Sequence, residues 1–511
     1  MDPLDPLIET LCANLPARPR QLRVLKNKFA KTTGTAPVSN STLLKEFHAQ
    51  VKEGHRAPNP QLERALTLNA VRSESGIAAV TVLTKPYACP GRCVYCPTEE
   101  KAPKSYLPDE PLVMRALDNG YDPYRQTLSR LNALENTGHP TDKIELIVKG
   151  GTWSFYPEEY QTDFIRRCFD AANGFGSGTL DEAHERNETA RRRIIGLTVE
   201  TRPDYVTPEE VRRLRHLGVT RVEMGVQSVE ERILELTVRD HGTEEVRQAT
   251  RLLKEAGFKV AYHMMPNLPG AEPEDDIRSF RALFEDPSYR PDALKIYPCV
   301  VVKSAPLYRW WKEGRYQPYG DDVLTELLIE LKRKVPPYVR IERVVRDIAA
   351  PVVEAGCRQN NLREEVFSRM RERGIFCRCI RCREVRSQTA GEFRLARREY
   401  EASGGREIFL SFEEPQTEKL AALLRLRICG FPPAAIVREL HTYGRHLPLE
   451  REQRDAAQHR GFGRRLMAEA ERIARDKFGL SRMAVISGIG VRGYYRKIGY
   501  RLEGTYMVKA L

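Results

Sequence analysis

The sequence predicts an α/β protein in which a partial barrel of six strand–helix units is followed by a second, smaller α/β domain. Six short runs rich in β-branched residues alternate with stretches of helical periodicity. Unusual polar motifs stand where several of these runs end, as expected for an active site at the carboxyl edge of barrel strands. A new α/β pattern starts near residue 391, after an arginine-rich connector. We therefore expect a basic helical region (1–70), the barrel (71–345), the connector (346–390) and the second domain (391–511).

The composition is that of a basic globular protein. Lys and Arg number 83 against 70 Asp and Glu, which gives a net charge of +13. This balance favours a polyanionic partner, nucleic acid first, with a generically basic soluble enzyme as the alternative. There is no apolar run of about 18 residues, and the acidic start MDPLDPLIET lacks the apolar core of a signal peptide. We expect a cytoplasmic protein without a membrane partner, whose 11 cysteines are reduced and available as ligands.

The N-terminal 70 residues have helical character and a concentrated positive charge. Residues 18–31 contain six basic side chains and no acidic one. Such a run is either a nucleic-acid-binding patch or an ordinary solvated helix face. Under the first interpretation the candidate RNA contacts are Arg20, Arg23, Lys26 and Lys28.

The barrel is predicted from strands and the helices between them. The expected strands are IAAVTVLT (77–84), IELIVK (144–149), IIGLTVE (194–200), TRVEMGV (220–226), FKVAYHMM (258–265) and DALKIYP (292–298). Helix candidates between them include PEEVRRLRHLG and TEEVRQATRLLKEAG, the second ended by Gly257. Such alternation fits either a barrel or a doubly wound sheet. The motifs favour the barrel, because CPGRCVYC, GGTW and ETRPD stand at or just after the ends of the first three strands.

The motif CPGRCVYC places Cys89, Cys93 and Cys96 on one short loop. Iron–sulfur clusters normally take four thiolates. Three thiolates can bind three irons of a 4Fe–4S cluster and leave the fourth iron open for a ligand, much as catalytic zinc keeps an open position. The alternative is a zinc knuckle, which lacks a nearby fourth ligand, because apart from His139 no His or Cys follows before Cys168.

This spacing after the first strand resembles the radical S-adenosylmethionine (SAM) superfamily. The resemblance implies that the open iron is chelated by the amino and carboxylate groups of SAM, and that Tyr95 lies against the adenine. It also implies contacts to the SAM amino group from Gly150, Gly151 and Thr152. Glu200 and Arg202, at the end of the third strand, are further candidate partners of SAM.

The C-terminal region carries a short motif that fits a phosphate-binding loop. QHRGFG, comprising Gln458, His459, Arg460, Gly461, Phe462 and Gly463, fits Q/R-x-x-G-x-G/A, whose backbone N–H groups cradle a pyrophosphate at a helix N-terminus. Its order with the strands AAIVREL and RMAVIS resembles the GCN5-related acetyltransferase fold, which binds acetyl-CoA this way. That resemblance assigns a tyrosine near the CoA sulfur to Tyr494 or Tyr495, with an aromatic core contact as the alternative. It makes Glu439 a candidate general base, with a surface glutamate as the alternative.

The connector carries three further cysteines. Residues 358–398 hold 12 Arg against five Glu, together with Cys377, Cys379 and Cys382 in CRCIRC. This spacing is typical of a structural zinc site, which needs a fourth ligand. Cys299, just after the sixth strand, is the candidate. The alternative is that these cysteines bind no metal.

A SAM barrel joined to an acetyltransferase domain resembles the catalytic subunit of Elongator and its stand-alone bacterial and archaeal relatives. The likeness covers nearly the whole chain, including KGGTW, ETRPDY, EMGVQSV and HRGFGRRLMAEAERIAR. It implies a tRNA uridine acyltransferase that binds the anticodon loop and carboxymethylates C5 of the wobble uridine, with acetyl-CoA as the acetyl donor and no obligatory protein partner.

Two alternatives predict different substrates. A protein lysine acetyltransferase with a scaffold Fe–S domain predicts a peptide substrate and a dispensable cluster. A non-catalytic RNA-binding module predicts no use for two cofactor loops. The basic segments and the intact cysteine triad favour the tRNA enzyme over both.

Overall fold

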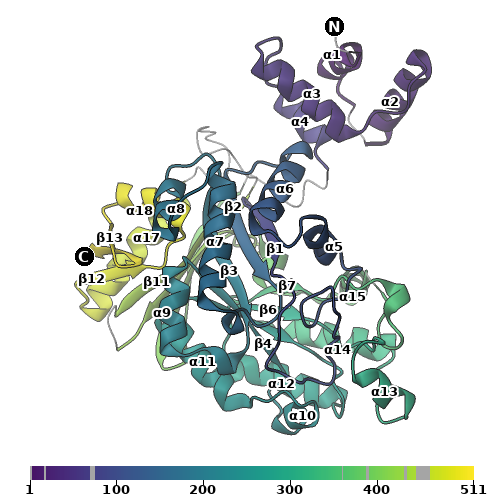
Figure 1. The fold of residues 1–511 in the computed structure, drawn as a ribbon. Coiled ribbons are helices and arrows are strands. Elements are labelled where there is room, and N and C mark those ends of the chain that lie inside the picture. The colour runs from purple at the N-terminus through teal and green to yellow at the C-terminus, as the bar shows by residue number, and fades with distance from the viewer. Residues whose placement is uncertain are drawn as a thin grey trace.

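The computed structural model describes residues 3–16, 19–68, 75–359, 361–386, 391–430, 434–444 and 461–511. Its described part contains two seven-stranded sheets and, at the N-terminus, four helices that stand apart from both sheets (Figure 1). None of the helices in these ranges combines the length and apolarity needed to cross a membrane.

The first sheet is the predicted barrel, opened along one side. Its strands are parallel and lie in chain order, so that β1 and β7 form its two edges. They are β1 (Ala78–Leu83), β2 (Lys143–Lys149), β3 (Arg193–Thr201), β4 (Arg221–Gln227), β5 (Lys259–Met264), β6 (Ala293–Ile296) and β7 (Arg340–Arg343). The six predicted strands are confirmed. The seventh was not predicted, because RIER contains a single apolar residue, whereas the equally short β6 lies within the predicted run DALKIYP.

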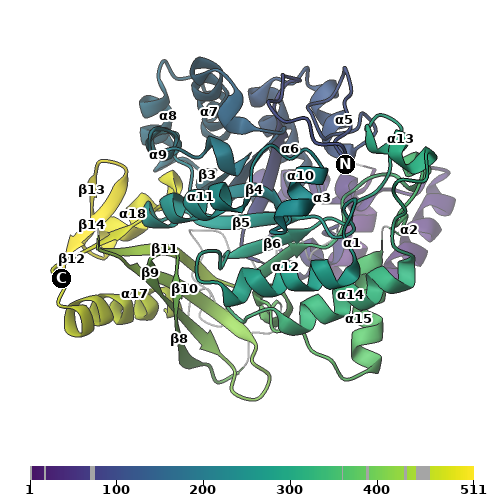
Figure 2. The same ribbon diagram turned by 90° about the horizontal axis from the view of Figure 1, so that it is seen from below.

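Helices cover the outer face of this sheet (Figures 1 and 2). They are α6 (Pro123–Asn136), α7 (Glu158–Asn173), α8 (Leu180–Asn187), α9 (Pro208–His216), α11 (Thr243–Glu255), α12 (Pro273–Glu285) and α14 (Asp321–Lys334). Three short helices pack elsewhere: α10 (Glu231–Leu236) and α13 (Leu307–Lys312) contact the cysteine loop, and α5 (Pro111–Asp118) contacts the segment that follows it. Local sequence explains their ends. The Thr207 hydroxyl caps α9 by accepting from the Glu210 N–H, and Gly257, with φ +85°, follows α11.

The N-terminal helices have a small core of their own. They are α1 (Asp5–Ala13), α2 (Pro19–Thr33), α3 (Asn40–Lys52) and α4 (Pro60–Leu66), and Leu43, Leu44 and Phe47 of α3 are fully buried. This bundle touches the barrel just beyond α6, where the Leu68 N–H donates to the Thr137 carbonyl at 3.1 Å. Gly138 lies at this contact between the bundle and the barrel. A Cβ at position 138 would stand only 2.6 Å from Thr67 Oγ1.

The second sheet follows the connector helices α15 (Leu362–Glu372) and α16 (Ile380–Arg383). Its order is β13-β14-β12-β11-β10-β9-β8. Its strands are β8 (Arg394–Ala402), β9 (Gly405–Glu413), β10 (Leu420–Ile428), β11 (Ala435–Thr442), β12 (Arg482–Val485), β13 (Arg501–Glu503) and β14 (Tyr506–Ala510). Helix α17 (Phe462–Arg472), a π-helical turn (Ile473–Lys477) and α18 (Arg492–Lys497) complete the region.

A β-bulge changes the course of β11 at Arg438. Arg425 of β10 pairs with Glu439 and Leu426 pairs with Val437, so Arg438 is the extra residue and leaves the ladder. On its other side β11 pairs with β12 only at Ile436 and Val437. Within the described residues, the two parallel strands therefore separate beyond the bulge.

The second sheet packs against the amino ends of the barrel strands. Asp292 and Phe258 stand directly before β6 and β5, and both bind Arg438. The Ser75 carbonyl, before β1, lies 2.9 Å from the His441 ring. The carboxyl ends of the barrel strands, where the cysteine loop begins, are thus left free of the second sheet.

A buried ionic network forms this contact. The Asp292 carboxylate accepts from Arg438 at 2.6 and 2.9 Å and from the Val260 N–H at 2.9 Å, and Arg425 lies 3.5 Å away. Arg438 also lies 3.1 Å from Glu407 of β9. All of these charged side chains are at most 4% exposed. The arginines hold the pKa of Asp292 well below its ordinary value despite its burial.

Removing one partner of this network should loosen the second sheet. The Asp292→Ala change leaves Arg438 and Arg425 buried and under-paired, a loss of about 3–5 kcal/mol. Hydrogen exchange of peptides from β10 and β11 should rise in this variant. Arg212→Met is the control, because its pair with Glu209 is mostly exposed and contributes below about 1 kcal/mol. Equal protection of β11 in both variants would contradict a structural role for the network.

Candidate active site

A single cavity of about 880 Å³ runs through the interior of the barrel. At the carboxyl end it is lined by Tyr95 and Cys96 of the cysteine loop. At the amino end it is lined by Glu439, His441 and Tyr443 of the second sheet. The cavity therefore extends from the cysteine loop to β11 of the second sheet, whereas Gly461, Gly463 and Tyr494 are not part of its lining.

The cysteine loop is held from beneath by two arginines. Arg239 donates to Cys93 Sγ at 3.3 Å, and Arg202 lies under Gly91, where a Cβ would stand 2.0 Å from its Nη1. A hydrogen bond from Cys96 and the Arg239 charge lower the pKa of Cys93 to about 5, although burial opposes this. A thiol of this kind is suited to bind iron as thiolate.

Arg239 reaches the loop from a strained turn. Its neighbours Val238 and Asp240 have φ of +53° and +62°. Left-handed backbone at a β-branched residue costs on the order of 1–3 kcal/mol and concentrates at functional sites. The carboxylate of Asp240 in turn accepts from the Arg92 N–H of the cysteine loop at 3.2 Å. Sequence reasoning missed Arg239, because no motif marks it.

The predicted GGT motif lies against the cysteine loop. Gly150 has φ +134°, and a Cβ there would come within 1.8 Å of Thr84 Oγ1 at the end of β1. Gly151 has φ +87°. Thr152 Oγ1 lies 3.8 Å from Cys89 Sγ. The glycines thus allow this loop to approach the cysteines closely.

Of the other predicted SAM contacts, Tyr95 and Glu200 face the cavity and Arg202 does not. The buried Tyr95 hydroxyl has no hydrogen-bond partner among the described residues. Glu200 accepts from Tyr106 at 3.0 Å and lies 3.2 Å from Lys149 Nζ. Arg202 binds Asp204 and the Arg239 carbonyl, and its buried Nη1 has no described partner.

The middle of the cavity is lined by charged side chains at alternating strand positions. Glu223 of β4, which is fully buried behind this lining, binds Lys149, Lys295 and, at 2.9 Å, His263 Nε2. Burial lowers the pKa of Lys295 to about 8 although Glu223 opposes the shift. The sequence analysis did not name these side chains. Polar residues at every second position of a predicted barrel strand could have indicated them, because alternate residues of such a strand face the barrel interior.

The predicted phosphate-binding loop is described only from Gly461 onward. Gln458, His459 and Arg460 lie outside the described residues. Gly461 has φ +71° and is the N-cap of α17, and Phe462 and Gly463 form the first turn of the helix. The first-turn N–H groups of an α-helix have no acceptor within the helix, which is why such a turn suits an anion.

Tyr494 lies next to this turn and Tyr495 does not. A Cβ on Gly463 would be 3.2 Å from the Tyr494 hydroxyl, which is buried without a described hydrogen-bond partner. Tyr495 packs edge-on against Tyr494 and Tyr500, as an aromatic core residue does. Helix α18, which carries both, is tied to the barrel by Arg492, 3.1 Å from Glu188.

Glu439 lines the amino end of the cavity but is held in ion pairs. It accepts from Arg425 at 2.8 Å and lies 3.5 Å from Lys259. Lys259 and Arg425 lower the pKa of Glu439 to about 2 against its burial. This environment favours a structural carboxylate and disfavours a general base near neutral pH.

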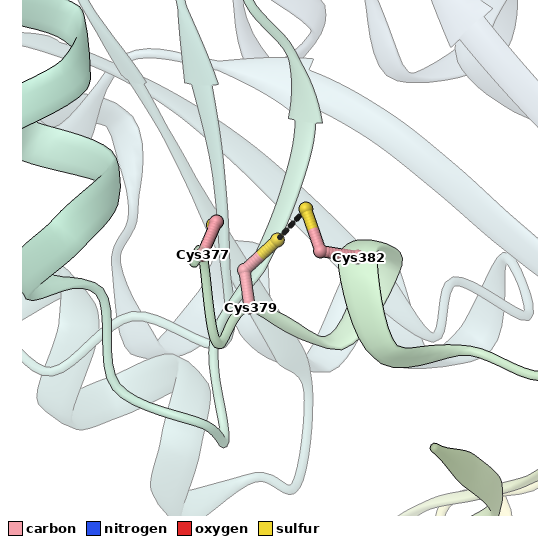
Figure 3. Close-up of side chains that lie close together, drawn as sticks. All are labelled: Cys377, Cys379 and Cys382. Carbon is pink, nitrogen blue, oxygen red and sulfur yellow. Dashed lines mark hydrogen bonds between the residues drawn. The ribbon is translucent and has the colours of Figure 1, made fainter. Parts of the chain in front are cut away.

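The three connector cysteines gather at one point (Figure 3). The sulfurs of Cys377, Cys379 and Cys382 lie within 4.8 Å of one another. Cys299 is not among them, which corrects the expected fourth ligand. It belongs to another core cluster, with Tyr316. Being next to the sixth strand in sequence did not bring it to the triad, because the chain after β6 turns toward Asn267.

The predicted RNA contacts lie on α2. Arg20, Arg23 and Lys28 are exposed, whereas Lys26 is half-buried and donates to Asn40 Oδ1 at 2.7 Å. Three of the four positively charged side chains are thus exposed to solvent.

Comparisons with family models and with known proteins point to the same family. The Radical SAM superfamily model matches residues 84–283 and the Radical_SAM C-terminal domain model matches residues 291–372. The tRNA uridine(34) acetyltransferase of Dehalococcoides mccartyi is 49% identical over 455 residues, which cover 86% of this chain and 99% of that protein. Human Elongator complex protein 3 is 45% identical over 471 residues, covering 87% and 86%.

A solved structure also matches. An N-terminally truncated Elp3 from the archaeon Methanocaldococcus infernus has 43% identity and a TM-score of 0.76, covering 86% of this chain and all of that one. The chain therefore belongs to the radical SAM family that comprises the tRNA uridine(34) acetyltransferases and Elongator complex protein 3.

Proposed function

We propose that this chain is a tRNA acyltransferase that uses acetyl-CoA and SAM to install a carboxymethyl group on C5 of the wobble uridine. Relatives named tRNA uridine(34) acetyltransferase supply the substrate class. The observation that carries the proposal is the shared cavity, which is lined at one end by the cysteine loop and at the other by the second sheet. Two independent enzymes on one chain would need no such connection.

The cysteine end fits a three-thiolate cluster. Cys89, Cys93 and Cys96 would hold the irons, and Arg239 would offset their negative charge. The unpartnered Tyr95 hydroxyl and the tight GGT loop would border the bound SAM. When bound, the cluster and SAM supply a 5′-deoxyadenosyl radical able to take a hydrogen atom from the acetyl methyl group.

The second sheet supports a GCN5-related acetyltransferase assignment. Acetyl-CoA would place its pyrophosphate at Gly461–Gly463 and its acyl arm in the gap where β11 and β12 separate. Leu440 and Thr442 of β11 lie near Gly463, whereas Glu439 and His441 face the cavity. An arm passing through the gap would therefore enter the barrel, with Tyr494 beside its path.

Distance constrains this arrangement. Barrel strands of six or seven residues at about 3.3 Å each separate the two cavity ends by roughly 20 Å. Reacting atoms must come within about 3–3.5 Å. The acetyl group would therefore travel along the barrel interior to the cysteine end.

The open side of the barrel supports RNA entry. The cavity lining includes β1 and β7, the two edge strands, and around it stand Arg115, Arg130, Arg343, Arg346, Arg381 and Arg386. Arginine is suited to phosphate contacts. We propose that the anticodon loop enters here, that exposed cations of α2 bind more distant phosphates, and that Cys377, Cys379 and Cys382 hold a structural zinc ion.

Anaerobic reconstitution with tRNA, SAM and acetyl-CoA, followed by nucleoside mass spectrometry, tests the proposal. We expect carboxymethylated uridine and 5′-deoxyadenosine, both dependent on all three substrates. Acetylated lysine in a peptide, formed without the cluster, would instead support a protein acetyltransferase.

The cluster assignment is tested by Cys93→Ala. Loss of this thiolate should abolish the visible absorbance of the reconstituted 4Fe–4S cluster, because two ligands remain. Cys168→Ala is the matched control, since Cys168 is a buried thiol of α7 outside the cavity. A full cluster in the Cys93→Ala protein would refute the assignment.

The shared cavity predicts that damage at either end stops the same reaction. Gly461→Glu puts a strained, negative residue at the proposed pyrophosphate site, so uridine modification should stop while the cluster and SAM binding survive. Cys93→Ala should stop modification while acetyl-CoA binding survives. A mixture of the two variants, diluted to monomers, should stay inactive. Restored activity would favour two separate enzymes.

The α2 cations should contribute to the salt dependence of tRNA binding. Replacing Arg20, Arg23 and Lys28 by Gln should reduce the slope of log K against log salt by about 0.7 for each lost phosphate contact, about 2 in total. Acetyl-CoA affinity should not change. Lys26→Gln is the comparison, because Lys26 already binds Asn40. An unchanged slope in the triple variant would indicate that α2 is an ordinary solvated surface and does not bind tRNA.

A further inference from the structure

Helix α13 presents an aromatic and basic surface beside the cysteine loop. Its sequence, LYRWWK, contains two of the three tryptophans of the chain. Leu307 is fully buried, and its N–H donates to the Val94 carbonyl of the cysteine loop at 2.8 Å. Trp310 and Trp311 are only partly buried against the same core cluster. Because Leu307 already anchors the helix, core packing alone does not account for two tryptophans that both reach the surface.

Cationic side chains lie over these rings. Lys312 Nζ is 4.8 Å from the ring centroid of Trp311 and 5.6 Å from that of Tyr308. Arg315, just after the helix, has its Cζ 4.4 Å from the ring centroid of Trp310. The Tyr308 and Trp311 rings are themselves 5.8 Å apart. The rings thus hold two cationic groups in place, which reduces the conformational entropy that these groups lose when a ligand binds.

The charge of this segment favours an anionic ligand. Residues 303–315 contain four Lys and Arg side chains and a single carboxylate, that of Glu313. Glu313 lies 2.6 Å from Arg309 and 3.3 Å from Arg315. Among the described residues no carboxylate pairs with Lys312, and Arg315 is 55% exposed. Positive charge beside exposed aromatic rings is the combination with which proteins bind single-stranded nucleic acid.

The segment is fixed next to the carboxyl end of the barrel cavity. Val302, which lines the cavity, precedes α13 by only a few residues. The Thr98 N–H, just beyond the cysteine loop, donates to the Ser304 carbonyl at 3.1 Å, and the buried Tyr316 hydroxyl donates to the Asn267 carbonyl at 2.6 Å. Helix α13 lies on the same side of the molecule as α2 and away from the second sheet (Figures 1 and 2).

We propose that α13 and Arg315 bind an unpaired nucleotide of the RNA substrate, with its base stacked on the exposed tryptophans and its phosphate held by Lys312 and Arg315. The inference rests on the proposed function and adds a contact outside the cavity. An anticodon loop whose target base enters the barrel leaves neighbouring nucleotides outside. A stacking surface beside the cysteine loop would hold one of these nucleotides and so fix which base enters.

Tryptophan fluorescence tests this contact directly, because the third tryptophan, Trp153, is only 2% exposed. Titration with an anticodon stem–loop RNA should quench the emission of the unsubstituted protein and of Trp153→Phe. The double variant Trp310→Phe, Trp311→Phe should lose most of the quenching. Polyglutamate, an anion without bases, is the comparison probe. Equal quenching by polyglutamate and by the stem–loop would show that the surface responds to charge alone and would contradict base stacking.

Affinity measurements separate stacking from charge. Trp310→Ala should weaken stem–loop binding roughly 5–150-fold, the range found when a stacking side chain is removed. Lys312→Gln and Arg315→Gln should each lower the slope of log K against log salt by about 0.7. Phe175→Ala is the matched control, because Phe175 is 52% exposed with Arg186 Cζ 4.8 Å from its ring centroid. The control should bind the stem–loop as tightly as the unsubstituted protein does.

The outcomes distinguish this inference from the proposed function. If tRNA is carboxymethylated while stem–loop binding is unchanged in Trp310→Ala and Arg315→Gln, the function stands and the role of α13 is refuted. Stem–loop quenching without uridine modification would support the RNA surface and contradict the proposed reaction. If Trp310→Ala does not fold, Lys312→Gln and Arg315→Gln decide, since both change exposed side chains. An unchanged salt slope in both would overturn the proposal.

Discussion

The Asp292 carboxylate is the constraint on which the relation of the two sheets depends. It accepts from the Val260 backbone inside the barrel and from both nitrogens of the Arg438 fork on the second sheet. Arg438 can reach it because the bulge takes this residue out of the β11 ladder. The same bulge precedes the point where β11 and β12 separate. One local irregularity thus fixes the docking of the second sheet and opens the gap proposed for the acyl arm.

The barrel interior also contains paired charges. A barrel is usually filled with apolar layers, whereas here Glu223, Glu200, Lys149 and Lys295 face one another. Buried ion pairs contribute little to stability compared with apolar packing, so their presence favours a role in binding or chemistry. The apolar core lies on the other side of the strands, against the helices. The sheet therefore has a stabilising outer face and a polar inner face.

Much of the fold was predictable because its signals are local. Six of seven barrel strands follow from β-branched runs, and the cysteine loop follows from spacing alone. The ionic contact was not predictable. Arg425 and Arg427 alternate with leucines in β10, which is typical of a strand with one solvated face, yet both are at most 2% exposed. Asp292, the partner of Arg425, is distant in sequence, and Glu407, the partner of Arg427, lies opposite it on the neighbouring strand β9. The Cys299 prediction failed for the same reason, since proximity along the chain does not fix a metal ligand.

The opening between β1 and β7 is the feature of the barrel that bears on how a large substrate could enter. The cysteine loop occupies the carboxyl end of the barrel and the second sheet covers the amino end. Both ends of the barrel axis are therefore covered. Closing the sheet would leave a large substrate no way in. In the described part of the chain no ladder joins β1 to β7, and arginines stand around the resulting opening. If acyl arm and SAM approach along the axis, RNA has to approach from the side. A barrel stopped short of closure is therefore what a three-substrate reaction in one cavity requires.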